Sequence, residues 1–207
     1  MVKVKICGIT NLEDAQVSVK AGCDALGFVF YRRSPRYISP EKAKSIIANI
    51  SGRATKIGVF VNSKEERIKN IAKSLGLDIL QFHGKESPDF CAKFKGYKII
   101  KTFRVRDRIE RKQLQRYRVF AYLFDTFVST KAGGTGKVFN WQLVKHLKGI
   151  KRPIFLSGGL TEDNVATAIK AVKPGWVDVS SSVESRPGKK DYKKVIKFIE
   201  AAKKVNR

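Results

Sequence analysis

The chain has 207 residues, of which 43% are hydrophobic and 10% aromatic, so it can bury a core and is not expected to be disordered. No apolar run approaches the roughly 20 residues that cross a bilayer, which argues against a membrane protein. The formal net charge is +25, with 43 Lys and Arg against 18 Asp and Glu.

This charge has two interpretations, a nucleic-acid-binding role or a solvated basic surface. We favour the second, because the cations are spread from Lys3 to Arg207 and no nucleic-acid-binding motif accompanies them. In either case, the charge favours the capture of an anionic substrate.

The three cysteines, Cys7, Cys23 and Cys91, are odd in number and far apart. This pattern predicts reduced thiols in a cytoplasmic protein and no disulfide framework. The chain also lacks the Cys-x-x-Cys or paired His spacing of a zinc site, so no metal is expected. The alternating residues 1–6 indicate a strand and no signal peptide.

Short apolar runs alternate with amphipathic segments along the whole chain. Strands are predicted at residues 2–6, 25–30, 56–61, 78–82, 98–103, 120–124, 153–156 and 176–179. Most of these runs are continuously apolar, which is typical of parallel strands buried on both faces.

Helices are predicted between the strands from their caps and periodicity. Capping boxes begin at Thr10 and Ser63, Ser-Pro pairs begin at Ser39 and Ser87, and the remaining N-cap candidates are Asn140, Thr161 and Asp191. Residues 106–118 are only weakly amphipathic. The strand–helix unit is thus repeated eight times, which favours a closed (β/α)8 barrel over an open sheet, with residues 1–207 as a single domain.

In such a barrel the active site lies at the C-terminal ends of the strands. Two glycines after the seventh predicted strand and the serines after the eighth predict a phosphate site, because the loops there commonly bind phosphate through backbone N–H groups. A plain glycine turn is the alternative. The predicted phosphate-binding residues are Ser157, Gly158, Gly159, Asp178, Ser180 and Ser181.

Two further strand ends carry candidate acid–base groups. Cys7 ends the first strand, where a thiolate can act as a base; the alternative is a small apolar filler. A surrounding positive field is expected to lower the pKa of this thiol. Asp125 ends an apolar strand, where desolvation would raise its pKa and suit a general acid; the alternative is a capping or ion-paired Asp. The glycine-rich residues 126–137 are interpreted as a substrate lid.

Several motifs occur in a characteristic order over essentially the whole chain. They include Lys5-Ile6-Cys7-Gly8, Ser34-Pro35-Arg36, Gln81-Phe82-His83-Gly84, Phe124-Asp125-Thr126, Gly133-Gly134-Thr135-Gly136 and Leu156-Ser157-Gly158-Gly159. In this order they resemble the phosphoribosylanthranilate isomerase family of tryptophan biosynthesis.

The resemblance implies an Amadori rearrangement of N-(5′-phosphoribosyl)anthranilate to the 1-deoxyribulose 5-phosphate product. It assigns Asp125 as the general acid that opens the sugar ring and Cys7 as the base that removes the C2′ proton. Arg36 would face the anthranilate carboxylate, and the other substrate-binding residues would be Gln81, His83 and Gly134. No metal or organic cofactor is implied, and we expect a monomer or a homodimer.

Three positions depart from the usual family pattern, namely Phe82, Asn140 and Ser182. If Ser182 replaces a glycine that needs a positive φ, the strain would cost about 1 kcal/mol or more. The nearest rival enzyme is the isomerase of histidine biosynthesis. It is disfavoured because no internal half-repeat is visible and Cys7 stands in place of a carboxylate.

Overall fold

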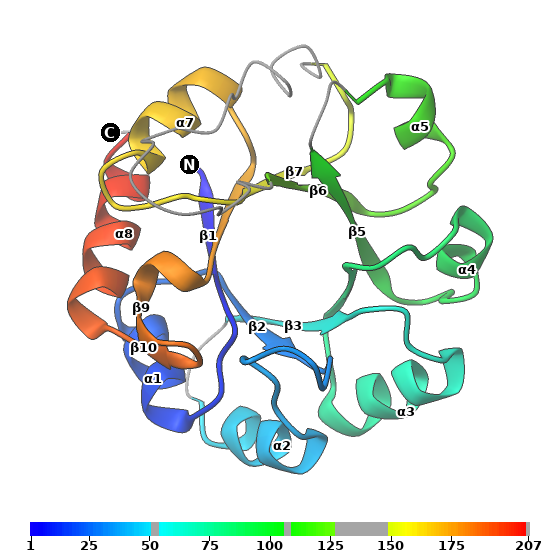
Figure 1. The fold of residues 1–207 in the computed structure, drawn as a ribbon, viewed down its shortest axis with the longest axis horizontal. Coiled ribbons are helices and arrows are strands. Elements are labelled where there is room, and N and C mark those ends of the chain that lie inside the picture. Colours follow the sequence, from blue (N-terminus) through cyan, green and yellow to red (C-terminus); the bar gives the residue numbers. More distant parts are fainter. Residues whose placement is uncertain (51–53, 106–108, 127–148, 206–207) are drawn as a thin grey trace.

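The computed structural model describes residues 1–50, 54–105, 109–126 and 149–205. Eight parallel strands close into a barrel in the order β1 to β8 (Figure 1). The strands are β1 (Lys3–Cys7), β2 (Ala25–Val29), β3 (Thr55–Phe60), β4 (Ile79–Phe82), β5 (Lys98–Val105), β6 (Ala121–Thr126), β7 (Ile154–Ser157) and β8 (Trp176–Val179). The predicted (β/α)8 barrel is confirmed, and each strand lies within two residues of its predicted bounds.

Helices surround the barrel as an outer ring (Figure 1). They are α1 (Leu12–Lys20), α2 (Pro40–Ala48), α3 (Glu65–Leu75), α4 (Pro88–Ala92), α5 (Arg111–Gln115), α7 (Val165–Val172) and α8 (Tyr192–Lys204). Between β8 and α8 the chain forms a short 3-10 helix, η1 (Ser181–Val183), and an antiparallel hairpin of β9 (Glu184–Arg186) and β10 (Lys189–Lys190). This hairpin is an addition to the regular strand–helix repeat.

The predicted helix caps are partly confirmed. Ser39, Ser87 and Asp191 accept hydrogen bonds from backbone N–H groups in the first turns of α2, α4 and α8. The Thr10 prediction is wrong, because Asn11 caps α1 and the Thr10 hydroxyl donates instead to the carbonyl of the distant Gly188.

Three other predicted helix starts need comment. The Ser63 cap is wrong, since α3 follows Lys64 without a side-chain cap. Thr161 precedes α7, but the N-cap position is Asn164. The predicted cap Asn140 lies outside the described residues, as does almost all of the predicted lid at 126–137.

The barrel interior is apolar at its N-terminal end. There a buried cluster closes the bottom, and it contains Ala25, Ile57, Ile79, Ile100, Ala121, Leu123, Phe155 and Trp176. Phe155 and Trp176 stack with their ring centroids 4.7 Å apart. Because this end is filled, the space for a ligand lies at the other end, where the strands terminate.

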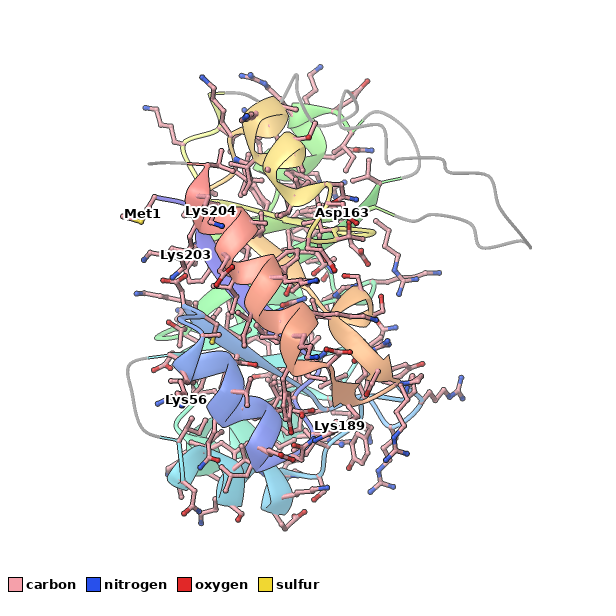
Figure 2. The ribbon with its side chains drawn as sticks, turned by 90° about the vertical axis from the view of Figure 1, so that its left-hand side faces the viewer. Met1, Lys56, Asp163, Lys189, Lys203 and Lys204 are labelled. Carbon is pink, nitrogen blue, oxygen red and sulfur yellow. The ribbon has the colours of Figure 1, made fainter. Side chains whose placement is uncertain are left out.

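The basic side chains are distributed over the outer surface. Figure 2 shows Lys56, Lys189 and Lys204 at separate places along the molecule, and none of them is buried. Among the described residues, the buried cations are the exceptions Lys5, Lys101 and Lys190.

Candidate active site

A cavity of about 960 Å³ lies at the C-terminal ends of the strands. All the predicted site residues that the structure describes line this cavity: Cys7, Arg36, Gln81, His83, Asp125, Ser157, Gly158, Gly159, Asp178, Ser180 and Ser181. Gly134 lies outside the described residues. The structure therefore brings together eleven residues from opposite ends of the chain.

Strand alternation explains how these side chains reach the cavity. Successive side chains of a strand point to opposite faces, and Ala121 and Leu123 of β6 belong to the interior cluster. Asp125 is the next residue of that inward series. On β4 the same spacing leads from Ile79 to Gln81, and His83 follows directly after the end of this strand. The interior is thus apolar at the bottom and polar at the top.

Cys7 lies beside a buried ion pair. Lys5 Nζ is 2.9 Å from Asp178 Oδ1, and the side chains are 0% and 6% exposed. Burial lowers the pKa of the Lys5 ammonium, but Asp178 and Cys7 together more than offset this, so the pKa is raised. Lys5 consequently stays charged next to the thiol.

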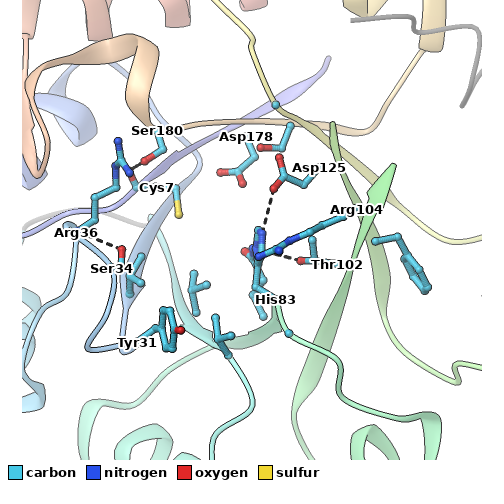
Figure 3. Close-up of a pocket in the computed structure, with 18 of the residues that line it drawn as sticks. Cys7, Tyr31, Ser34, Arg36, His83, Thr102, Arg104, Asp125, Asp178 and Ser180 are labelled. Atoms are coloured by element: carbon cyan, nitrogen blue, oxygen red, sulfur yellow. Dashed lines mark hydrogen bonds and ion pairs between the residues drawn. The ribbon is translucent and has the colours of Figure 1, made fainter. Parts of the chain in front are cut away.

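The prediction that the pKa of Cys7 is lowered is wrong. Burial raises the pKa of the Cys7 thiol, and the opposing effects of Lys5 and Lys190 do not cancel it. Cys7 is only 8% exposed, and Figure 3 shows its sulfur pointing into the cavity. The ordinary resting form is therefore the neutral thiol, with a cation close enough to stabilise the thiolate when it forms.

Asp125 is held by His83. Its Oδ2 lies 3.1 Å from His83 Nε2, and Nδ1 of the same ring lies 3.0 Å from the amide nitrogen of Gln81. Gln81 donates to Nδ1 in this arrangement, which leaves the proton of a neutral ring on Nε2, facing Asp125. The Asp125 side chain is 30% exposed, so the cavity wall shields it partly from water. Figure 3 shows the carboxylate on the opposite side of the cavity from Cys7.

Arg36 forms a bidentate ion pair with Glu184. Nε donates to Oε1 at 2.8 Å and Nη2 donates to Oε2 at 2.7 Å. The Arg36 side chain is 23% exposed and that of Glu184 is 4% exposed. An unpaired surface arginine, which the crowding of basic residues in this segment could suggest, is thereby ruled out.

The turn after β7 has a backbone conformation that glycine favours, as predicted for this loop. Gly158 and Gly159 adopt φ values of 88° and 64°, which favour glycine. The Asn164 amide binds the Gly159 carbonyl at 2.9 Å and fixes this turn. Ser182 lies outside the positive-φ region and its hydroxyl donates to the Leu160 carbonyl, so it ties the loops after β7 and β8 together without backbone strain.

Two predicted phosphate ligands have other partners. The Asp178 carboxylate is bound to Lys5, and a second anion beside it would be repelled, so its prediction as a phosphate ligand is wrong. The Ser180 hydroxyl donates to the Cys7 carbonyl at 3.1 Å, which leaves only its oxygen toward the cavity.

A second buried ion pair fixes the loops after β3 and β4. Lys101 Nζ is 2.7 Å from Glu86 Oε2, and both side chains are almost fully buried. Glu86 also accepts the N–H groups of Asn62 and Gly84 at 2.8 and 2.9 Å. Since Gly84 follows His83 directly, this network holds the loop that carries the imidazole.

Five charged residues in and around the site were not predicted to have a role, namely Lys5, Glu86, Lys101, Glu184 and Lys190. The sequence feature that could have pointed to two of them is a lysine inside an otherwise apolar strand, as at Lys5 and Lys101.

Within the described ranges, no three His, Cys, Asp or Glu side chains gather in a way that could hold a metal ion. The same ranges contain no helix that is long and apolar enough to cross a membrane.

Fold and cavity are those of a (β/α)8-barrel enzyme, with the candidate acid–base groups and the candidate anion-binding loops at one end. The family model described as N-(5'phosphoribosyl)anthranilate (PRA) isomerase matches residues 4–201. The N-(5'-phosphoribosyl)anthranilate isomerase of Pelobacter propionicus is 51% identical over 203 residues, which cover 98% of this chain and 96% of the relative. The chain therefore belongs to the N-(5'-phosphoribosyl)anthranilate isomerase family.

Solved structures agree with this assignment. The phosphoribosyl anthranilate isomerase of Thermotoga maritima has a TM-score of 0.92 and 45% identity, and the match covers 99% of this chain and 100% of that one. A phosphoribosyl anthranilate isomerase in complex with reduced 1-(o-carboxyphenylamino)-1-deoxyribulose 5-phosphate has a TM-score of 0.89 and 43% identity, with the same coverage.

Proposed function

We propose that this enzyme converts N-(5′-phosphoribosyl)anthranilate into 1-(o-carboxyphenylamino)-1-deoxyribulose 5-phosphate in tryptophan biosynthesis. The observation that carries the proposal is the placement of Cys7 and Asp125 on opposite sides of one cavity, which Arg36 and the glycine turn after β7 also line. The relatives described above bear the name of this activity, so neither the histidine-pathway isomerase nor a nucleic-acid-binding role is favoured.

The reaction needs a proton delivered to one atom and a proton removed from another. Asp125 protonates the ring oxygen while the C–O bond breaks, which gives an open-chain Schiff base. Cys7 as thiolate then removes the C2′ proton, and the enolamine that forms tautomerises to the ketone. Because two groups on opposite sides of the substrate perform these steps, neither group has to serve both proton transfers.

Neighbouring side chains keep both groups ready. His83 Nε2 lies within hydrogen-bond distance of Asp125 Oδ2 and so orients the carboxyl toward the cavity. Lys5, held by Asp178, supplies the positive charge that stabilises the Cys7 thiolate during turnover. Removal of the C2′ proton therefore depends on a buried cation that does not itself touch the substrate.

Different residues of the cavity are assigned to the two charged groups of the substrate. Arg36 binds the anthranilate carboxylate, because a guanidinium matches a carboxylate with parallel hydrogen bonds. The backbone of Gly158, Gly159 and Ser181 surrounds the phosphate, and Ser157 and Ser180 adjoin it.

The remaining attributes are also part of the proposal. We place the enzyme in the cytoplasm on the ground that Cys7, Cys23 and Cys91 are all free thiols. Residues 1–207 form one domain, which acts as a monomer or a homodimer and uses no cofactor. A related solved structure is named as monomers of the dimeric Thermotoga maritima isomerase.

The test is direct conversion of N-(5′-phosphoribosyl)anthranilate prepared in situ. Substrate and product are isomers, so NMR is the appropriate detection. The sugar C1′–H signal should be replaced by a CH2 signal beside a ketone. A Cys7→Ser, Asp125→Asn double variant is the matched control. Failure of the parent enzyme to produce the ketose, with the fold verified by circular dichroism, would refute the proposal.

A further inference from the structure

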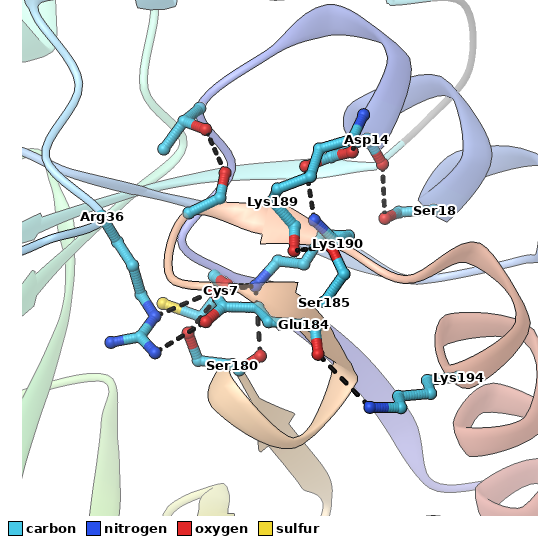
Figure 4. Close-up of polar contacts among 12 residues, drawn as sticks. Cys7, Asp14, Ser18, Arg36, Ser180, Glu184, Ser185, Lys189, Lys190 and Lys194 are labelled. Atoms are coloured by element: carbon cyan, nitrogen blue, oxygen red, sulfur yellow. Dashed lines mark hydrogen bonds and ion pairs between the residues drawn. The ribbon is translucent and has the colours of Figure 1, made fainter.

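The hairpin β9–β10 contacts Arg36, one of the residues that line the cavity. Its first residue, Glu184, carries the carboxylate that both Nε and Nη2 of Arg36 contact. Its last residue, Lys190, has a fully buried side chain that contacts Glu184, with Nζ 3.0 Å from Oε1 (Figure 4). Arg36, Glu184 and Lys190 thus form a cation–anion–cation row that ends at the cavity.

Burial lowers the pKa of the Lys190 ammonium and Glu184 opposes this effect, while the contacts of Nζ are those of a charged lysine. Its Nζ donates to three acceptors, the Cys7 carbonyl at 2.6 Å, the Ser180 carbonyl at 3.2 Å and Glu184. A lysine offers three hydrogens only in its charged form. The row therefore carries one net positive charge, since two cations face one carboxylate.

Helix α1 holds the hairpin in place through Asp14. The Lys190 backbone N–H donates to Asp14 Oδ2 at 2.8 Å, and Asp14 is fully buried in α1. Lys189 Nζ lies 3.1 Å from the other oxygen of Asp14. The base of the row is therefore anchored to an outer helix and does not depend on a ligand.

The geometry of Arg36 leaves one edge available for a substrate. Glu184 takes the edge formed by Nε and Nη2. A guanidinium has a second edge, formed by Nη1 and Nη2, which can bind another carboxylate with two parallel hydrogen bonds. Glu184 thus fixes the plane of the guanidinium, and Lys190 keeps the row cationic although Glu184 neutralises one charge.

We propose that Glu184 and Lys190 are positioning residues that make the enzyme select substrates with a carboxylate on the aromatic ring. Glu184 orients Arg36, and Lys190 maintains the net positive charge toward the ring carboxylate. The inference rests on the proposed role of Arg36 and deepens it.

A pair of ligands isolates this role. One is reduced 1-(o-carboxyphenylamino)-1-deoxyribulose 5-phosphate, and the other is the same molecule without the ring carboxylate. The ratio of their dissociation constants, measured by calorimetry, reports recognition of the carboxylate alone. Phosphate binding and general damage to the cavity cancel in this ratio.

Glu184→Gln distinguishes positioning from charge. The substitution raises the net charge of the row, so a purely electrostatic role predicts a larger preference for the carboxylated ligand. Positioning predicts the opposite, because a Gln side chain cannot accept both donors and Arg36 loses its fixed plane. We expect the preference to fall by at least roughly tenfold.

Lys190→Met lowers the net charge and should reduce the preference by a similar factor while the Arg36–Glu184 pair remains. It also serves as the second test if Glu184→Gln does not fold. The matched control is Glu13→Gln, which removes an exposed carboxylate paired with the neighbouring Lys189 and should leave the ratio unchanged.

The outcomes separate this inference from the proposed function. An unchanged or increased preference in Glu184→Gln overturns the inference, as does an equal loss for both ligands. If Arg36→Met abolishes the preference while Glu184→Gln and Lys190→Met retain it, Arg36 binds the carboxylate and the positioning claim fails. If Arg36→Met also retains the preference, the role given to Arg36 under the proposed function fails.

Discussion

Replacing Lys5 with Met should destabilise the barrel through electrostatics alone. Met has nearly the length of the lysine stem, so the substitution leaves little cavity. It removes the cation 2.9 Å from Asp178, whose side chain is 6% exposed, and leaves that carboxylate buried and unpaired. Breaking a buried pair in this way costs about 3–5 kcal/mol. Such a loss is a large fraction of the roughly 5–15 kcal/mol that stabilises a domain.

The pH dependence identifies the cause. Burial already raises the pKa of the Asp178 carboxyl in the folded parent, where Lys5 opposes the effect. Without Lys5 the folded pKa rises further above the unfolded value, and protonation removes the penalty. The penalty is therefore full above the folded pKa and shrinks as pH falls through it. Urea unfolding at about pH 8 and about pH 5.5 should give a larger difference between parent and variant at the higher pH.

A double variant serves as the control. Lys5→Met combined with Asp178→Asn removes both charges, so it should recover much of the stability and lose the pH-dependent difference from the parent. A Lys5→Met penalty below about 1 kcal/mol, or one equal at both pH values, would refute the assignment of Lys5 and Asp178 as a mutually dependent buried pair.

Three further predictions concern catalysis. Because burial raises the pKa of Cys7, the thiolate fraction should rise with pH from about pH 6. The value of kcat/KM should rise with it, by up to roughly tenfold per pH unit, and a flat profile would contradict the thiolate base. Asp125→Asn should lower kcat by about 10²–10⁴-fold in steady-state assays with little change in KM, and an undiminished kcat would exclude it as the acid. Gly159→Asp should raise KM at least roughly tenfold by repelling the phosphate, while circular dichroism remains that of the parent; an unchanged KM would place the phosphate elsewhere.

The strands and the site residues at their ends could be predicted from the sequence. Buried parallel strands have a distinctive apolar composition, and chain order alone places Cys7 and Asp125 at the same end of a closed barrel. The inward direction of Asp125 follows from the two-residue period of β6.

The ion pairs could not be predicted in the same way. Lys5 and Asp178 are 173 residues apart, and Arg36 and Glu184 are 148 apart. No local pattern links such positions, and only the closure of β8 on β1 brings the first pair together. The wrong direction for the pKa of Cys7 has the same origin, because net charge is visible in the sequence but the burial that outweighs it is not.

The central claim, that Cys7 is the base of the rearrangement, is tested most directly by kcat of Cys7→Ser at saturating N-(5′-phosphoribosyl)anthranilate. Serine fills nearly the same space but does not ionise at working pH. The account predicts a kcat lower by at least roughly 10²–10⁴-fold, with KM within a few-fold of the parent. A kcat within a few-fold of the parent would make Cys7 a packing residue and contradict the account.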